Sequence, residues 1–115
     1  MKKYNVFVYG TLKQGYGNHH FLENSEFVGN AYTFDKYSLY IDNIPFVVDD
    51  PVSHIQGELY RVDQKTLSEI DRLEGHPYFY KRKRVNIKLE NGKLTRGWLY
   101  FGPESIGELE LSGKY

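Results

Sequence analysis

The sequence predicts an α+β fold, in which short strands form a small, curled or barrel-like, antiparallel or mixed sheet beside one main helix. Three observations favour this fold class. Short runs of apolar and aromatic residues recur between turn residues, and only one stretch has helical periodicity. The chain has 115 residues, enough for one hydrophobic core and too few for two, so we expect residues 1–115 to form a single domain.

The composition excludes several classes of protein. The 15 Lys and Arg balance the 15 Asp and Glu, so the excess positive charge of general nucleic-acid binders and polybasic membrane proteins is missing. Without cysteine there is no disulfide, thiol nucleophile or cysteine-ligated metal. No run approaches the roughly 20 apolar residues that span a bilayer, and Met1–Tyr4 leads into a strand rather than an apolar signal segment. We therefore expect a cytoplasmic protein that does not bind membranes.

The first predicted strand is Tyr4–Tyr9, which carries large apolar residues on both faces. Such a strand is central in a sheet or lines a barrel. It ends at Gly10, and Thr11–Asn18 is predicted to be a loop. His19–Asn24 is predicted to form one short helical turn.

Four further strands are predicted in the middle of the chain from their Phe, Tyr, Val and Ile content. Their expected ranges are Phe27–Tyr32, Tyr37–Ile41, Pro45–Val48 and Ile55–Val62. The third is expected to end at Asp49-Asp50-Pro51, because a proline cannot donate to a sheet.

The main helix is predicted over Asp63–Glu74. Asp63 is a suitable N-cap, Leu67, Ile70 and Leu73 repeat at helical spacing, and Gly75 is a typical C-terminal stop.

Two strands joined by a hairpin are predicted after the helix. In residues 84–89 apolar Val85, Ile87 and Leu89 alternate with polar residues, as in a half-buried strand. Asn91-Gly92 is a strong hairpin signal, and it returns the chain into Leu94–Phe101. The tail after residue 103 carries no clear pattern.

Glu74 lies among the apolar residues of the predicted helix. On a helical wheel, Leu67, Ile70 and Leu73 form one apolar arc, and Glu74 falls on this arc between Ile70 and Leu67. Asp71 flanks the same arc on the other side of Leu67. Burial and the negative end of the helix dipole both raise the pKa of a carboxyl group. The pattern therefore predicts a general acid/base at Glu74.

A second interpretation of Glu74 is purely structural. Helix ends fray, and the side chain would then reach solvent or pair with Arg72, Arg82 or Arg84.

The turn after the first strand is a candidate binding loop. Gly10 allows another molecule to approach the main chain, and successive N–H groups of Gly10, Thr11 and Leu12 can form a hollow for a carboxylate or an oxyanion. A glycine at a strand end is also an ordinary turn residue. Lys13 could meet an anionic group or remain in solvent.

Several motifs together resemble the γ-glutamylcyclotransferase-like family, and most closely its γ-glutamylamine cyclotransferase branch. They are, in order along the chain, Tyr9-Gly10-Thr11-Leu12, the loop residues Lys13, Gly15, Asn18 and His19, Ile70-Asp71-Arg72-Leu73-Glu74-Gly75, Tyr80-Lys81-Arg82, and Gly97-Trp98-Leu99-Tyr100. The match spans residues 6–101. The ending Leu111–Tyr115 departs in part from the family's usual Gly-Asp-aromatic ending.

The resemblance implies a fold, a reaction and a set of site residues. The fold is a small mixed β-barrel with a cavity beside the helix. Tyr9, Gly10, Thr11 and Leu12 would bind a small-molecule γ-glutamyl substrate, and Glu74 would be the catalytic acid/base that releases 5-oxoproline and a free amine. No metal or organic cofactor is expected. The leaving amine stays open among glutathione-, polyamine- and crosslink-derived groups.

Other functions fit parts of the same sequence. The chain could be a binding module for a small carboxylate without turnover. The basic run Lys81–Arg84, with many tyrosines, could mark a barrel that binds single-stranded nucleic acid, but alternation on a strand points at most two of these side chains the same way. His19, His20 and Glu23 form a weak metal pattern without further ligands. We expect no nucleic-acid partner, and a monomer or small homo-oligomer.

Overall fold

The computed structural model describes residues 2–115 and has the predicted α+β fold. In chain order its elements are β1 (Tyr4–Val8), the short 3₁₀ helix η1 (His19–Leu22), β2 (Glu26–Asp42), β3 (Ile44–Val62), α1 (Gln64–Glu74), β4 (Lys81–Leu89), β5 (Leu94–Phe101) and β6 (Glu108–Leu109). The part of the chain that the structure describes has no helix long and apolar enough to cross a membrane.

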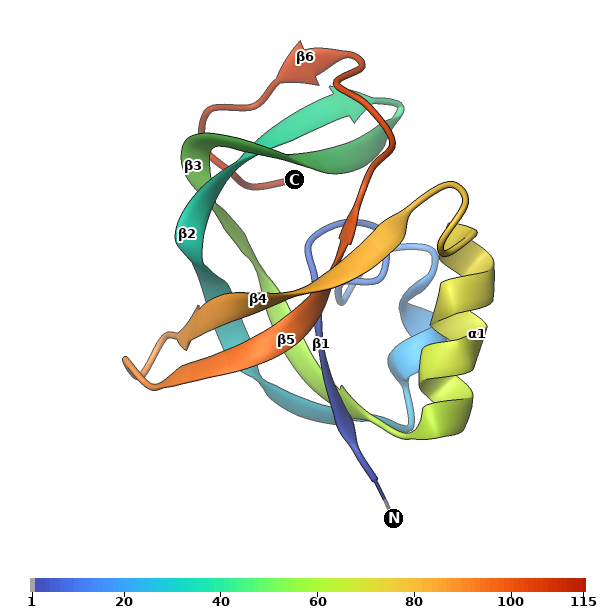
Figure 1. Ribbon diagram of the computed structural model, residues 1–115. Coiled ribbons are helices and arrows are strands. Elements are labelled where there is room, and N and C mark those ends of the chain that lie inside the picture. Colours follow the sequence, from blue (N-terminus) through green and yellow to red (C-terminus); the bar gives the residue numbers. More distant parts are fainter. Residues whose placement is uncertain (1) are drawn as a thin grey trace.

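Five strands close into a barrel. The sheet order is β3-β1-β5-β4-β2, and β2 pairs again with β3, which closes the circle (Figure 1). All of these pairings are antiparallel except that of β1 with β5, where Val6 lies opposite Trp98. The predicted barrel-like mixed sheet is therefore confirmed. Short β6 extends the sheet beyond β2.

Strand β1 separates two hydrophobic cores. Phe7 and Tyr9 pack inside the barrel with residues from the other four strands. Val6 and Val8 point the opposite way, into a second core that Leu67 and Ile70 of α1 complete. This explains why β1 is apolar on both faces, as the sequence indicated, since each face of a strand takes alternate residues.

Two predicted strand breaks are wrong. The segments predicted as Phe27–Tyr32 and Tyr37–Ile41 form one strand, β2, with an irregular pairing between Tyr32 and Lys36. There Thr33 takes the place of a main-chain partner: its hydroxyl accepts a hydrogen bond from Ile55 N (2.9 Å) and donates one to Asp35 O (2.7 Å). The chain therefore bulges without turning away.

The segments predicted as Pro45–Val48 and Ile55–Val62 likewise belong to one strand, β3. Asp49-Asp50-Pro51 does not end it. Ser38 pairs with Val48 and the preceding Tyr37 with Ser53, so residues 49–52 bulge out of the ladder. A proline in such a bulge forfeits no ladder hydrogen bond, which is why Pro51 is tolerated.

The helix and the hairpin follow the predictions. The Asp63 carboxylate caps α1 by accepting a hydrogen bond from Thr66 N (2.8 Å), and Gly75 ends the helix with φ 70°. Asn91-Gly92 lies in the turn between β4 and β5. In Figure 1, α1 lies along one side of the barrel next to η1, and the C-terminal end of α1 is near the start of β4.

Candidate active site

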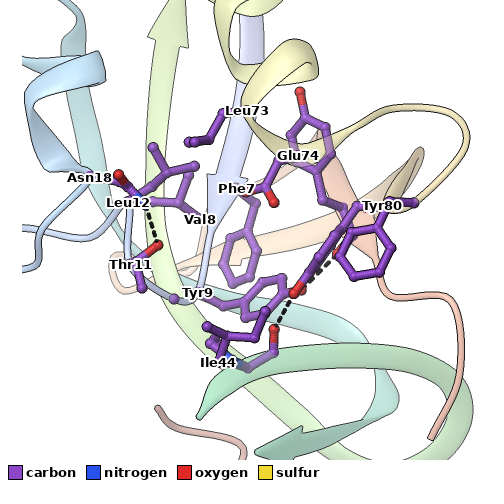
Figure 2. Close-up of a pocket in the computed structure, with 14 residues that line it drawn as sticks. Phe7, Val8, Tyr9, Thr11, Leu12, Asn18, Ile44, Leu73, Glu74 and Tyr80 are labelled. Atoms are coloured by element: carbon purple, nitrogen blue, oxygen red, sulfur yellow. Dashed lines mark hydrogen bonds between the residues drawn. The ribbon is translucent and has the colours of Figure 1, made fainter. Parts of the chain in front are cut away.

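A cavity of about 220 Å³ opens between the end of α1, the end of β1 and the loop that follows β1. Mostly apolar and aromatic side chains line it, and within residues 2–115 Glu74 is the one carboxyl, lysine or arginine group among them. Figure 2 shows the Glu74 side chain reaching in from α1, with Thr11 and Leu12 on one side and Tyr80 on the other. The structure thus brings together Glu74 and all four predicted loop residues, namely Tyr9, Gly10, Thr11 and Leu12.

The Glu74 carboxyl group is poorly solvated. Burial raises its pKa from 4.5 to about 7. Among residues 2–115 no arginine or lysine pairs with it, so the alternative of an ion pair with Arg72, Arg82 or Arg84 is not realised. A carboxyl group with a pKa near neutrality can exchange protons in both directions at physiological pH.

Three tyrosine hydroxyls near Glu74 are committed elsewhere. Tyr9 donates its hydrogen to Tyr100 O (2.8 Å), and Tyr80 donates to Pro45 O (2.8 Å). Tyr100 donates to Asp71 Oδ1 (2.6 Å). Because a phenol has one hydrogen to donate, none of the three remains for Glu74. Burial, together with the charge of Glu74, raises the pKa of Tyr80 well above its usual value, so this phenol stays protonated.

Asp71, one turn earlier on α1, is the opposite kind of carboxylate. Arg82 binds it through two hydrogen bonds (2.8 and 3.1 Å) in addition to the one from Tyr100. Burial opposes its ionisation, but these donors outweigh burial and lower the pKa of Asp71. The helix therefore presents one carboxylate that is held charged and one that is poised to titrate.

The loop after β1 lines the cavity and contains main-chain donors without a main-chain acceptor among the described residues. The N–H groups of Gly10, Thr11 and Leu12 donate to no main-chain oxygen within residues 2–115. The loop keeps its shape because Asn18 bonds to Thr11 twice, from its N–H to Thr11 O (3.0 Å) and from Nδ2 to Oγ1 (3.0 Å), the second of which Figure 2 shows. Consecutive free N–H groups suit an anion.

The mouth of the cavity is apolar. Ile44, Leu73 and Phe79 line it and remain 41%, 39% and 50% exposed. Leu73 was predicted to lie on the buried face of the helix, and it instead lines the cavity as a partly exposed side chain.

The other candidate residues, the two histidines and the basic run, do not line the cavity. His19 and His20 point to different carbonyls, Leu12 O (2.9 Å) and Gly17 O (3.1 Å). The basic run alternates along β4 as expected, and its Arg82 is occupied by Asp71 and by the ring of Trp98 (4.3 Å to the centroid).

Sequence reasoning passed over Tyr100 as a lining residue. The alternation of side chains along β5 could have predicted this role. Tyr100 lies on the same face of the strand as Trp98, and this face packs toward α1.

Comparison with known proteins gives matches over most of the chain. Residues 6–115 match the model of a family described as gamma-glutamyl cyclotransferase, AIG2-like. A Methanocaldococcus jannaschii protein named "Putative gamma-glutamylcyclotransferase MJ1514" is 54% identical over 96% of this chain and 93% of its own length. Gamma-glutamylaminecyclotransferase C of Danio rerio is 38% identical over 87% of this chain and 76% of its own length.

A solved structure has the same fold. The crystal structure of an AIG2-like protein from Mus musculus superposes with a TM-score of 0.89 and 28% identity, covering 100% of this chain and 89% of that one. The likeness extends over all the elements that build the cavity. The chain therefore belongs to the gamma-glutamyl cyclotransferase, AIG2-like family.

Proposed function

We propose that this chain cyclises γ-glutamyl amines, releasing 5-oxoproline and a free amine, with Glu74 as general acid/base. The observation that carries the proposal is an unpaired carboxyl group, with a pKa of about 7, in a cavity that is also lined by a loop whose successive main-chain N–H groups have no acceptor in the described main chain. These are the two elements that an intramolecular attack of an amine on an amide requires: a proton acceptor for the nucleophile and donors for negative charge.

The proposed reaction begins when the Glu74 carboxylate takes a proton from the substrate's α-ammonium group. The freed amine attacks the γ-carbonyl carbon, forming a ring C–N bond and a tetrahedral oxyanion. Protonated Glu74 then gives its proton to the nitrogen of the old amide, whose C–N bond breaks. The second ammonium proton follows through the same carboxylate, so the amine leaves as R–NH₃⁺ and no water is consumed.

The donors after Tyr9 hold either the α-carboxylate of the substrate or the developing oxyanion. Cyclisation is favoured further because the cavity holds the two ends of the γ-glutamyl group together.

The apolar rim supports an alkyl leaving group. Ile44, Leu73 and Phe79 offer hydrophobic contact to carbon atoms next to the scissile amide, and no lysine or arginine of the described chain lines the cavity to meet a carboxylate there. We therefore expect γ-glutamyl derivatives of alkyl amines to be turned over with higher kcat/KM than γ-glutamyl dipeptides. Relatives named gamma-glutamylaminecyclotransferase agree with this choice.

Product analysis tests the reaction. Incubation with a γ-glutamyl alkylamine should yield 5-oxoproline and the amine in equal amounts, with no glutamate and no oxygen incorporated from labelled water. Release of glutamate would identify a hydrolase. Binding of the substrate without either product would identify the chain as a carboxylate-binding module.

The pH dependence of kcat/KM is expected to follow the ionisation of Glu74. Because the reaction needs the carboxylate, and burial raises its pKa to about 7, activity should rise with pH and level off above an apparent pKa near 7. Initial rates at low substrate concentration between pH 5 and pH 9 measure this limb. An acid limb near pH 4.5 would mean that Glu74 is solvated or is not the base.

Gly10→Ala is expected to reduce kcat/KM by about tenfold, the effect of a displacement that weakens one charged hydrogen bond. A Cβ atom at this position would lie 2.6 Å from Cγ of Pro45, which forms part of the cavity wall. The loop must then move away from β3 and carry its N–H donors with it. Gly17→Ala is the matched control, since a Cβ there meets nothing within 4 Å. Equal activity of the two variants would contradict a role for the Gly10 main chain.

A further inference from the structure

The last residues of the described chain are fastened to strand β3 of the barrel. Ser53 donates a hydrogen bond from its hydroxyl to Leu111 O (2.6 Å), and Gln56 N donates to Gly113 O (2.8 Å). Gly113 has φ 72°, and a Cβ there would lie 2.1 Å from His54 O, so the segment follows β3 closely. We call residues 111–115 the strap, and its residues 111–113 are fixed along β3.

The strap leads to the loop that lines the cavity. Lys13 is only 7% exposed, and its ammonium group donates a hydrogen bond to Tyr115 O (2.7 Å). The same ammonium lies 5.2 Å from the ring centroid of Tyr16 and 5.9 Å from that of Tyr115. The two ring centroids are 5.5 Å apart, so the Lys13 ammonium group joins Tyr16 of its own loop to Tyr115 of the strap.

Lys13 is buried rather than free in solvent, and it is not among the residues that line the cavity. Burial lowers the pKa of Lys13, and its hydrogen-bond acceptor is a main-chain oxygen rather than a side-chain carboxylate. Placing an ammonium group there is unfavourable unless the contacts to the oxygen and the rings compensate, so the geometry depends on all three.

Lys13 follows Leu12 directly in the chain, and its N–H donates to Gly10 O (3.1 Å). The turn that contains the cavity-lining residues Thr11 and Leu12 is thus closed by Lys13, whose side chain is bound to Tyr115. We propose that Lys13 is a positioning residue, which locks the substrate-binding loop by joining it to Tyr115. This inference rests on the proposed function of the loop.

The other ties of the loop do not replace this one. Asn18 and His19 bond back to Thr11 and Leu12, within the same segment of chain. One further bond joins the loop to another element: Gln14 N donates to Oε1 of Glu58 in β3 (3.0 Å), which fixes the loop after Lys13. Removing the Lys13 tie should therefore loosen the loop without unfolding the barrel.

Lys13→Met is expected to raise KM for a γ-glutamyl alkylamine by about tenfold, while kcat stays within about twofold, because the loop binds the substrate and Glu74 is untouched. Hydrogen exchange of the amides of residues 10–18 should accelerate by a similar factor. Lys13→Arg keeps the charge and should restore most of both properties. Lys114→Met, which removes a neighbouring exposed lysine, should match the wild type.

The proposal is overturned if Lys13→Met keeps the wild-type exchange of residues 10–18, if it changes kcat alone, or if Lys114→Met has the same effects. If Lys13→Met fails to fold, Tyr115→Ala replaces it, because this variant removes a ring beside the ammonium group. We expect the same changes in KM and in the exchange of residues 10–18, and their absence would overturn the proposal. An inactive wild-type chain would refute the proposed function instead, and the exchange comparison would still decide whether Lys13 holds the loop.

Discussion

Glu74→Gln is expected to lower kcat by at least about a hundredfold, within the range of general acid/base catalysis, while the substrate still binds. Glutamine has the same shape, but its amide can neither accept the ammonium proton nor return a proton to the leaving amine. The cavity and the free N–H groups of Gly10, Thr11 and Leu12 are unchanged. Turnover is measured as 5-oxoproline formed, and binding by calorimetry with the same γ-glutamyl alkylamine.

Glu69→Gln is the matched control. Glu69 is an exposed glutamate on the same helix, so the variant removes an equal charge outside the cavity. It should retain wild-type activity. Full activity of Glu74→Gln, or an equal loss in both variants, would remove Glu74 from the mechanism.

Glu74→Gln is also expected to change the stability of the folded protein, by an amount that depends on pH. The folded state raises the pKa of Glu74 from 4.5 to about 7, so between these values folded protein binds more protons than unfolded protein. The stability of the wild type therefore falls as pH rises through this window. Glu74→Gln lacks this loss, and we expect its melting temperature relative to wild type to increase from pH 4.5 to pH 7. A difference in melting temperature that stays constant or decreases between pH 4.5 and pH 7 would contradict this.

The arrangement of the candidate site could be predicted from the sequence because each of its two parts lies in one short segment of the chain. Glu74 follows from the position of one residue on an eleven-residue helix, and the loop follows from a glycine at the end of a strand. The sequence also predicted that both faces of β1 are buried, because apolar residues occupy both faces. In the structure each face packs into one of the two hydrophobic cores.

Features that depend on contacts between distant segments could not be predicted. Whether Asp49-Asp50-Pro51 ends a strand or bulges from it depends on Ser38, twelve residues before Asp50, whose hydroxyl donates to Asp50 O (2.7 Å). The partner of Lys13 lies 102 residues away along the chain. No local pattern distinguishes a lysine held between two tyrosine rings from one in solvent.

Asp71→Asn is expected to lower the free energy of unfolding by about 3 kcal/mol at pH 7, the effect of leaving one partner of a largely buried ion pair uncompensated. The side chains of Arg82 and Asp71 are only 18% and 20% exposed, and the carboxylate accepts three hydrogen bonds. Urea denaturation gives the value. A loss below about 0.5 kcal/mol, the effect of an ordinary surface substitution, would contradict a stabilising role for the pair.

The pH dependence of this loss has a definite sign. Because the pKa of Asp71 is lowered on folding, its contribution is complete above the ordinary aspartate pKa and disappears as pH falls through the folded-state value. The gap between wild type and Asp71→Asn should therefore close in acid. Arg82→Met in both backgrounds completes a double-mutant cycle, in which most of the loss should be shared.

Asp71→Asn also tests whether Asp71 stabilises the fold without affecting the protonation of Glu74. The asparagine side-chain oxygen can still accept the hydrogen of Tyr100, so this hydroxyl stays turned away from Glu74. The acid limb of kcat/KM should then remain near pH 7 although the protein is less stable. A limb displaced toward pH 4.5 would show that the Asp71–Arg82 pair sets the protonation of Glu74 as well as the packing of α1 against the barrel.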